Sequence, residues 1–380
     1  MRVHLKKVVL CLLLSATLSA YAQPSLKTTV FRKGENGFDT YRIPAIIQTQ
    51  DGALIAFAEA RKNSGSDTGD IDLVAKRSLD GGQTWGSIIT VWDDADNTCG
   101  NPCPVVDRES GKIILVTTWN KGSDSESEIN TRKSEDTRRI FVQTSDDNGV
   151  TWTSATEITS SVKDPAWTWY ATGPCHAVQL YNKENRGRLV IPCNHGVFGK
   201  GTRSHIIYSD DLGASWHLGG SLQKGNEATA AELKNGDIIL NMRGPRTKGK
   251  GRTRENAGRL TSFSNDGGRN FQPAMQDNAL TEPVCQGSII NYTKRGRPTE
   301  TLFFSNPDNP EKRKDMTVKR SKDSGTTWEV AFRLGAAPAA YSDLVVMSNG
   351  DLGVLYETGK AKCYERIDFV RFNKKSIKKL

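Results

Sequence analysis

The apolar residues of this chain fall into short runs that are separated by clusters of turn-forming residues. Typical runs are ALIAFAEA at 53–60, KIILVTTW at 112–119 and LGVLYE at 352–357, each flanked by Gly, Asn or Asp. Short aliphatic and aromatic runs with such boundaries are typical of β-strands. No stretch of about twelve residues shows the apolar period of an amphipathic helix. The pattern therefore predicts an all-β protein.

An octet of the form Ser-x-Asp-x-Gly-x-Thr-Trp punctuates the strands. It occurs at 78–85, 145–152 and 321–328, with weaker copies at 209–216 and 264–271. The copies begin 67, 64, 55 and 57 residues apart, which is the regular spacing of stacked repeats. Asp and Gly at these offsets favour a tight turn, and the terminal aromatic ring can pack between strands. We interpret the octet as a structural turn and not as a ligand site.

Each repeat holds about four short strands, which is the composition of a β-propeller blade. The length of 23–380 divided by the repeat predicts one domain, a six-bladed β-propeller with octet turns in five blades. The sixth blade, near 341–372, lacks the octet and is expected to close the ring with an N-terminal strand around 28–31. Active sites of propellers lie at the central axis, so the octets are expected to lie far from it.

The first 22 residues have the pattern of a secretory signal peptide. A basic start with Arg2, Lys6 and Lys7 precedes the apolar run 8–14, and Ala20-Tyr21-Ala22 fits the cleavage site. The rest of the sequence contains no run of about 20 apolar residues, so it predicts no membrane span. We expect cleavage before Gln23 and export to the periplasm or the extracellular space.

Net charge and cysteines exclude few functions. Cleavage removes three basic residues and no acidic one, so the formal net charge falls from +9 to +6. Much of this charge lies in the Gly-rich segment 244–259 and at the C-terminus, without the stacking aromatics that nucleic-acid binding requires. An attraction for an anionic substrate stays open. The six cysteines of 23–380 permit disulfides, but free thiols fit equally well, and no adjacent His suggests zinc.

Three arginines occupy similar positions in different repeats. Arg42 opens the first repeat, Arg243 ends the run DIILNMR, and Arg313 precedes the run MTVKRS. Three guanidinium groups that converge on one axis repel each other unless an anion holds them together. A planar guanidinium pairs with a carboxylate through two parallel hydrogen bonds. The arginines therefore predict a substrate that carries a carboxylate.

A series of short motifs resembles one enzyme family over essentially all of 23–380. The motifs are YRIPAI at 41–46, FAEAR at 57–61, SDTGDIDLV at 66–74, NPCPVVD at 101–107, NEATAAEL at 226–233 followed by NMRG, FSNP with Arg313, and AAYSDL at 339–344. Their order, and their phase against the octets, resembles the bacterial exo-α-sialidases, or neuraminidases, of glycoside hydrolase family 33. In that family the octets are known as Asp boxes or BNR repeats.

The resemblance implies a role for nine residues. Arg42, Arg243 and Arg313 would bind the carboxylate of sialic acid, Glu357 would support Arg42, and Arg61 and Asn101 would contact the 4-position or the N-acetyl side of the sugar. Tyr341 would be the nucleophile, Glu227 its base and Asp67 the acid/base. Many relatives have Asp at the position of Asn101. The resemblance implies that the protein needs no metal or cofactor. It also implies sialylated glycans, glycoproteins or glycolipids as substrates, and a monomer.

The substrate explains the unusual nucleophile that the resemblance implies. Most retaining glycosidases attack with a carboxylate, and sialidases with Tyr are an exception. The anomeric carbon of sialic acid bears a carboxylate, so a neutral phenol avoids repulsion between like charges. A phenol with a pKa of about 10 is a poor nucleophile, so Glu227 would accept its proton. Asp67 would protonate the leaving group and then activate water.

Several points stay open at this stage. The family motif GPGxG is replaced here by Gly173-Pro174-Cys175-His176-Ala177, which leaves linkage preference undecided, and His176 is interpreted as a loop residue. Three further residues either line the sugar pocket or pack in the core: Trp119, Tyr170 and Gln286. The alternatives to hydrolysis are a trans-sialidase or intramolecular trans-sialidase on the same scaffold, and a non-catalytic propeller that binds glycans.

Overall fold

Strands dominate the computed structural model, which describes residues 23–245 and 251–379. The predicted signal peptide at 1–22 and part of the basic segment 244–259 lie outside the described residues. Within them, 25 strands and three short helices occur, and none of the helices is long and apolar enough to cross a membrane. The helices are α1 (Glu126–Thr131), α2 (Thr159–Val162) and α3 (Lys374–Lys378).

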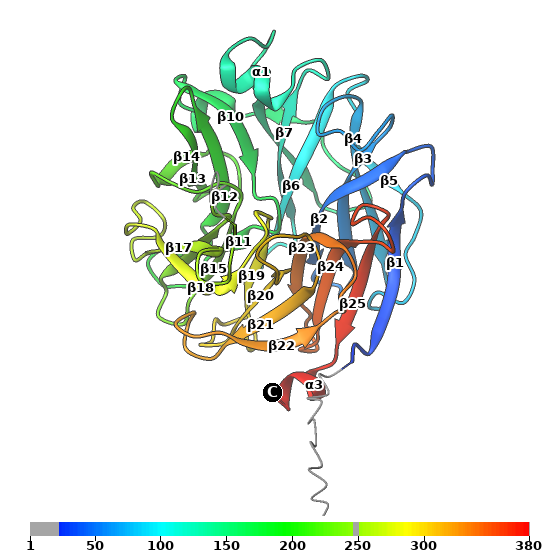
Figure 1. Cartoon of the computed structure of the whole chain (residues 1–380), viewed down its shortest axis with the longest axis vertical. Coiled ribbons are helices and arrows are strands. Elements are labelled where there is room, and N and C mark those ends of the chain that lie inside the picture. The colour runs from blue at the N-terminus through cyan, green and yellow to red at the C-terminus, as the bar shows by residue number, and fades with distance from the viewer. Residues whose placement is uncertain (1–22, 246–250, 380) are drawn as a thin grey trace, which may run out of the picture.

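The described strands form sheets that surround a common centre (Figure 1). One eight-stranded sheet contains β2 (Thr40–Gln48), β3 (Leu54–Arg61), β4 (Ile71–Ser78), β5 (Ile89–Trp92), β6 (Thr98–Val106), β7 (Ile113–Asn120), β8 (Arg139–Ser145) and β9 (Thr156–Glu157). The next contains β10 (Trp167–Thr172), β11 (Val178–Gln179), β12 (Leu189–Val197), β13 (Gly201–Ser209) and β14 (His217–Ser221).

Three four-stranded sheets complete the ring. They contain β15 (Ala228–Glu232), β16 (Ile238–Met242), β17 (Gly258–Ser264) and β18 (Met275–Thr281); β19 (Ser288–Asn291), β20 (Leu302–Pro307), β21 (Met316–Ser321) and β22 (Glu329–Arg333); and β1 (Leu26–Arg32), β25 (Arg366–Phe372), β24 (Leu352–Thr358) and β23 (Ala339–Val346). The predicted all-β propeller is confirmed. The count of six blades stays a prediction, because β2 to β9 form one hydrogen-bonded sheet.

The ring closes where the two ends of the chain meet. β1 pairs antiparallel with β25, and Leu26 lies opposite Arg371. The predicted closure by an N-terminal strand around 28–31 is confirmed. Phe31 is 1% exposed and stacks on Tyr41 of β2 with ring centroids 5.2 Å apart. The closing strand therefore also packs against the neighbouring sheet.

Middle strands are buried along their whole length. Every residue of β3, β16 and β24 is buried, because neighbouring sheets cover both faces. Strands that are buried on both faces read as continuous apolar runs instead of alternating ones. This explains why the run ALIAFAEA of β3 is almost continuously apolar.

The octets form tight turns, as predicted. In the octet at 145–152, Asp147 accepts hydrogen bonds from the Ser145 hydroxyl at 2.8 Å and from the Thr151 amide and hydroxyl at 2.9 and 2.6 Å. The Ser145 hydroxyl in turn accepts the Gly149 amide at 2.9 Å. Trp152 packs edge-on against Phe57 of β3, with ring centroids 5.7 Å apart. The octet therefore fastens β8 to a strand from a different repeat.

All six cysteines of the described residues are free thiols, and five of them are buried: Cys99, Cys103, Cys175, Cys193 and Cys285. The sheets are therefore held together by packing and hydrogen bonds. Of the two alternatives that the sequence left open, the structure has free thiols.

Candidate active site

A cavity of about 1240 Å³ opens where the first strands of the sheets converge. It exceeds the roughly 300–1,000 Å³ of a typical small-molecule site. Eight of the nine predicted site residues line it: Arg42, Arg61, Asp67, Asn101, Glu227, Arg243, Arg313 and Tyr341. The ninth, Glu357, is buried behind Arg42. All five octets are described, and none of their residues lines this cavity.

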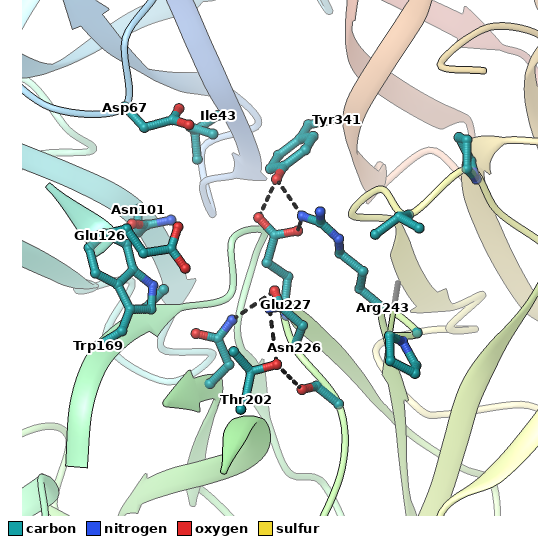
Figure 2. A pocket seen from close by; sticks show the side chains of 18 of the residues that line it. Ile43, Asp67, Asn101, Glu126, Trp169, Thr202, Asn226, Glu227, Arg243 and Tyr341 are labelled. Atoms are coloured by element: carbon teal, nitrogen blue, oxygen red, sulfur yellow. Dashed lines mark hydrogen bonds and ion pairs between the residues drawn. The ribbon is translucent and has the colours of Figure 1, made fainter. Parts of the chain in front are cut away.

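Tyr341, Glu227 and Arg243 form the centre of the cavity (Figure 2). The Tyr341 hydroxyl donates a hydrogen bond to Glu227 Oε1. Arg243 Nη1 donates to Glu227 Oε2 at 2.7 Å and to the Tyr341 hydroxyl at 3.2 Å. Glu227 and Arg243 come from segments next to β15 and β16, and the Arg243 amide donates to the Glu227 carbonyl at 2.9 Å. Sheet pairing thus fixes the spacing of these two side chains.

Tyr341 lies on β23 and is 5% exposed. Burial raises the pKa of Tyr341 well above 10, and the negative charge of Glu227 raises it further, while the nearby arginines oppose the shift. Its phenol is therefore neutral at physiological pH. A neutral phenol that already donates to a carboxylate is arranged for transfer of its proton to Glu227 as a bond forms.

Arg42 is aimed at the cavity by a β-bulge. The register of β2 against β3 shifts between Arg42 and Ala45, and Ile43 has a φ of 59°. A bulge of this kind bends the strand and redirects a side chain. Arg42 Nε lies 3.2 Å from Glu357 Oε1, and its guanidinium lies 4.1 Å from the centre of the Tyr364 ring. Arg42 Nη2 is buried without a hydrogen-bond partner among the described residues.

Glu357 links Arg42 to β23, the strand that carries Tyr341. Its carboxylate also accepts the Ile43 amide at 2.9 Å and the Tyr341 amide at 3.1 Å. The predicted support of Arg42 by Glu357 is therefore present in the structure. The same carboxylate also links β2 to β23.

Arg313 approaches Tyr341 from another side. Its Nη1 donates to the Tyr364 hydroxyl at 2.6 Å and its Nη2 to the Val284 carbonyl at 3.2 Å. Its guanidinium lies 5.4 Å from the centre of the Tyr341 ring, and that of Arg42 lies 5.1 Å from it. Three guanidinium groups thus surround one phenol, an arrangement that favours a bound anion.

Asp67 projects from the loop between β3 and β4, with 69% of its side chain exposed. It accepts a hydrogen bond from Arg42 Nη1 at 2.9 Å and one from Arg61 Nη1 at 2.7 Å. The surrounding protein partly desolvates the carboxylate, which acts to raise the pKa of Asp67, but the positive charges of Arg61 and Arg42 prevail and lower it. Arg61 also pairs with Glu59 at 2.6 Å, so it holds a structural ion pair and lines the cavity as well.

Asn101 lies near Glu126 and Trp169, across the cavity from Arg243 (Figure 2). A register shift in β6 between Gly100 and Cys103 and a φ of 53° accompany its position. Its side-chain oxygen accepts hydrogen bonds from Arg138 and, at 3.2 Å, from Thr118. Asn101 therefore faces the cavity with its amide nitrogen.

Comparison with known proteins identifies the family. The model of the BNR repeat-like domain matches residues 52–354. The exo-alpha-sialidase of Arthroderma benhamiae is 30% identical over 370 residues, which cover 89% of this chain and 84% of that protein. The chain belongs to the sialidase family.

Two further relatives of this sialidase family are longer than the chain. The sialidase of Micromonospora viridifaciens is 29% identical over 340 residues, which cover 86% of this chain and 51% of that protein. The structure of a Hadza microbial sialidase superposes with a TM-score of 0.80 at 30% identity, covering 92% of this chain and 69% of that one. The predicted sialidase function and glycoside hydrolase class are supported by these relatives. The restriction to bacterial sialidases is not, since a fungal relative matches equally well.

Sequence reasoning missed several residues that line the cavity or contact its arginines: Tyr364, Arg138, Trp169, Glu126 and Asn226. Tyr364 and Arg138 each come shortly before a strand, as Arg313 does, and this position was the available signal. Arg138 alternates with Arg139, which instead pairs with Asp136 at 2.5 Å. Adjacent side chains of an extended segment point to opposite faces, so Arg138 lines the cavity and Arg139 does not.

Of the three residues left open between pocket and core, Tyr170 and Gln286 are buried in the core, and the partly buried Trp119 packs against it. Trp119 donates to Asp94 at 2.6 Å, Tyr170 lies 3.0 Å from His205, and Gln286 donates to two backbone carbonyls. None of the three lines the described cavity. Trp169, next to Tyr170 on β10, lines the cavity instead.

Proposed function

We propose that this protein is an exo-α-sialidase that releases terminal α-linked sialic acid from glycans, glycoproteins or glycolipids, with retention of configuration, as in glycoside hydrolase family 33. The observation that carries the proposal is the contact between the Tyr341 phenol and the Glu227 carboxylate inside a ring of three arginines. A phenol is an uncommon nucleophile, and because it is neutral it suits an anomeric carbon to which a carboxylate group is attached.

Arg42, Arg243 and Arg313 would hold the substrate carboxylate. The buried, unpartnered Nη2 of Arg42 supplies a donor that no described residue satisfies, and a buried donor without a partner costs about 1–3 kcal/mol. A carboxylate bound there removes this cost. Because the guanidinium groups are held in place before the substrate arrives, they also stabilise the transition state without reorganisation.

The chemistry then takes two steps. Tyr341 Oη forms a bond to the anomeric carbon while its proton passes to Glu227, and the bond to the leaving oxygen breaks as Asp67 protonates it. In the second step Asp67 takes a proton from water, the water oxygen bonds to the anomeric carbon, and the Tyr341 oxygen leaves with the proton from Glu227. Two displacements at one centre retain the configuration.

Asp67 must be protonated to act as the acid, yet Arg42 and Arg61 lower its pKa in the free protein. We propose that the substrate carboxylate replaces Asp67 at Arg42 Nη1. The bound carboxylate neutralises the charge of Arg42 and adds a negative charge nearby. Both effects raise the pKa of Asp67, so substrate binding prepares the acid.

We also infer that the eight-stranded sheet consists of two blades, which makes six in total. Its halves, β2 to β5 and β6 to β9, are joined through a single parallel pair, Ile71 with Thr98. All other pairs within each half are antiparallel, as in the remaining sheets.

We further propose export through the N-terminal signal, on the evidence of the sequence pattern at 1–22 alone. N-terminal sequencing of the protein recovered outside the cytoplasm checks this proposal. A mature protein that begins at Gln23 supports it, and an intact N-terminus in the cytoplasm contradicts it.

NMR of the products from α2,3- and α2,6-sialyllactose tests the proposed reaction. We expect the α-anomer of free sialic acid to appear first. Transfer to lactose or an anhydro product would show a transglycosylase instead, and no reaction would favour the glycan-binding alternative. Tyr341→Phe is expected to abolish release of sialic acid from sialyllactose, and release at the wild-type rate would refute the mechanism.

A further inference from the structure

The inner edge of β23, the strand that carries Tyr341, is not hydrogen-bonded to another strand of the described residues. β23 pairs with β24 on one side only. On the other side, side chains from another sheet take the backbone hydrogen bonds. Gln286 accepts the Ser342 amide at 3.0 Å and donates to the Ser342 carbonyl at 2.9 Å, and the Ser288 hydroxyl accepts the Leu344 amide at 3.3 Å.

The fully buried carboxylate of Asp343 anchors this edge. It accepts the Ile46 amide at 2.8 Å, the His176 amide at 3.0 Å and the Ser288 hydroxyl at 2.8 Å, and the His176 ring nitrogen Nδ1 lies 2.7 Å away. Its neighbour Leu344 donates its amide at 2.9 Å. One side chain thus joins β23 to β2, to β19 and to the loop before β11. We call Asp343, Ser288, Gln286 and His176 the central brace.

The central brace lies next to the nucleophile in the chain. Asp343 follows Tyr341 by two positions on the same strand, and the hydrogen bonds of both side chains to other sheets place them at the centre of the ring. The peptide between them belongs to Ser342, which Gln286 holds on both its amide and its carbonyl. Any displacement of the brace is therefore passed to Tyr341 through one residue.

The strand β19 relates the nucleophile to its base. Ser288 of β19 binds Asp343, two residues after Tyr341. The next residue, Ile289, donates its amide at 3.1 Å to the hydroxyl of Thr229, which lies two residues after Glu227. β23, which carries the nucleophile, and β15, which follows the base, are thus held by two adjacent residues of β19.

We propose that the central brace consists of positioning residues that set the Tyr341 phenol against the Glu227 carboxylate. This inference rests on the proposed function, in which those two groups exchange a proton. None of the brace residues lines the cavity, so they act through Tyr341 and not on the substrate. A misplacement of about 1 Å at a reacting group can lower the rate by about 10²-fold.

Ser288→Ala tests the brace, because it removes one donor to Asp343 and the acceptor of the Leu344 amide while keeping Gln286 and His176. We expect kcat on sialyllactose to fall by roughly tenfold, with KM within about twofold, because the arginines that bind the carboxylate are unchanged. The matched control is Ser262→Ala, which removes a fully buried hydroxyl on β17 that donates to the Gln272 carbonyl. The control is expected to keep the wild-type kcat.

Hydrogen exchange gives a second measurement that does not depend on activity. In Ser288→Ala the amides of 339–346 are expected to exchange at least tenfold faster, while those of β17 stay protected, and Ser262→Ala is expected to show the reverse. Unchanged exchange at 339–346, or an equal loss of kcat in both variants, overturns the brace. A wild-type protein that cleaves no sialoside refutes the proposed function instead, and the exchange measurement still decides the brace.

Asp343→Asn is the more severe variant, because the Asn amide nitrogen meets backbone donors where the carboxylate accepted them. We expect it to reduce both the folded yield and the rate of covalent labelling of Tyr341 by a 2,3-difluorosialic acid. A folded Asp343→Asn protein that labels Tyr341 at the wild-type rate contradicts the proposed positioning.

Discussion

At the scale of single residues, arginines lie beside both Tyr341 and Asp67, but the pKa of Tyr341 is raised and that of Asp67 is lowered. Burial and the charge of Glu227 raise the pKa of Tyr341 despite the arginines around it. Asp67 is two-thirds exposed on a loop, and the positive charges of Arg61 and Arg42 lower its pKa although burial opposes them. Tyr341, the proposed nucleophile, is therefore neutral and Asp67, the proposed acid/base, is ionised before substrate binds.

Replacement of Asp67 should affect substrates according to their leaving group. We expect Asp67→Asn to lower kcat/KM on sialyllactose by roughly 10²- to 10⁴-fold, the usual contribution of a general acid. A nitrophenyl sialoside, whose leaving group needs no protonation, serves as the control and should lose far less. Equal losses on both substrates would contradict the role of Asp67 as the acid.

The displacement of Asp67 from Arg42 predicts a difference between two pH profiles. The profile of kcat/KM reports pKa values of the free enzyme, and that of kcat reports those of the complex. Because the pKa of Asp67 is lowered in the free protein and should rise in the complex, kcat should persist to higher pH than kcat/KM. Initial rates on sialyllactose between about pH 3 and pH 8 measure both profiles. Coincident alkaline limbs would show that substrate does not alter Asp67.

At the scale of elements, the octets carry stability and not chemistry. Each one closes a turn around an Asp carboxylate and places an aromatic ring against the core, as Trp85 does against Phe369 at 5.6 Å between ring centroids. The active-site residues come instead from bulged inner strands and the loops beside them. This division allows the turns to repeat while the inner edges differ from blade to blade.

Asp147→Ala should therefore weaken folding and leave the specific activity of the folded protein nearly intact. It removes the acceptor of hydrogen bonds from Ser145 and Thr151, and we expect a loss of about 1–2 kcal/mol in the free energy of unfolding. The neighbouring Asp146, whose side chain is 72% exposed and forms an ion pair with Lys112 at 3.6 Å, supplies the control variant Asp146→Ala. Urea unfolding and activity per folded molecule measure the two effects. A large loss of specific activity would contradict the structural role.

The same turn predicts a dependence on acid. Burial acts to raise the pKa of Asp147, but the hydrogen bonds from Thr151 and Ser145 lower it from 3.8 to about 2. A group with a lowered pKa stabilises the fold above its unfolded value and loses this effect as pH falls through the folded value. The stability difference between the wild type and Asp147→Ala should therefore be full above about pH 5 and shrink toward pH 2.

At the scale of the whole molecule, the ring depends on the pairing of its first and last strands. β1 supplies the outer strand of a sheet whose other three strands come from the C-terminal end of the chain (Figure 1). That sheet carries Tyr341 and Glu357, so closure of the ring also supports the site. Hydrogen bonds and packing close the ring, since the cysteines of the described residues are free thiols.

Phe31→Ala should destabilise the whole ring. Phe31 is buried against Tyr41 and the Lys76 ammonium lies 5.3 Å from its ring centre, and truncation of a buried Phe to Ala costs about 3–5 kcal/mol. Phe198→Ala, at a ring that is 54% exposed, is the control and should change stability by less than about 0.5 kcal/mol. Denaturant midpoints with unchanged slopes measure both. Equal effects of the two variants would contradict the importance of the closing strand.

The sequence by itself determined the strand content, the octet turns and the closing strand, because these depend on local patterns that repeat. Its motifs also supplied the nine site residues, of which eight line one cavity. Arg42, Arg243 and Arg313 could be grouped because the octets set the phase of the repeats. Chemistry that depends on residue type and on repeat position was therefore readable from the chain.

The tertiary structure alone decided which side chains meet across the centre. Trp169 lines the cavity and Tyr170 does not, because successive side chains of a strand point to opposite faces. Tyr364 meets Arg42, and Asp343 meets Ser288 and His176, although different sheets supply the partners. Such contacts depend on the bulges and on the angle between neighbouring sheets, which no local pattern of residues specifies.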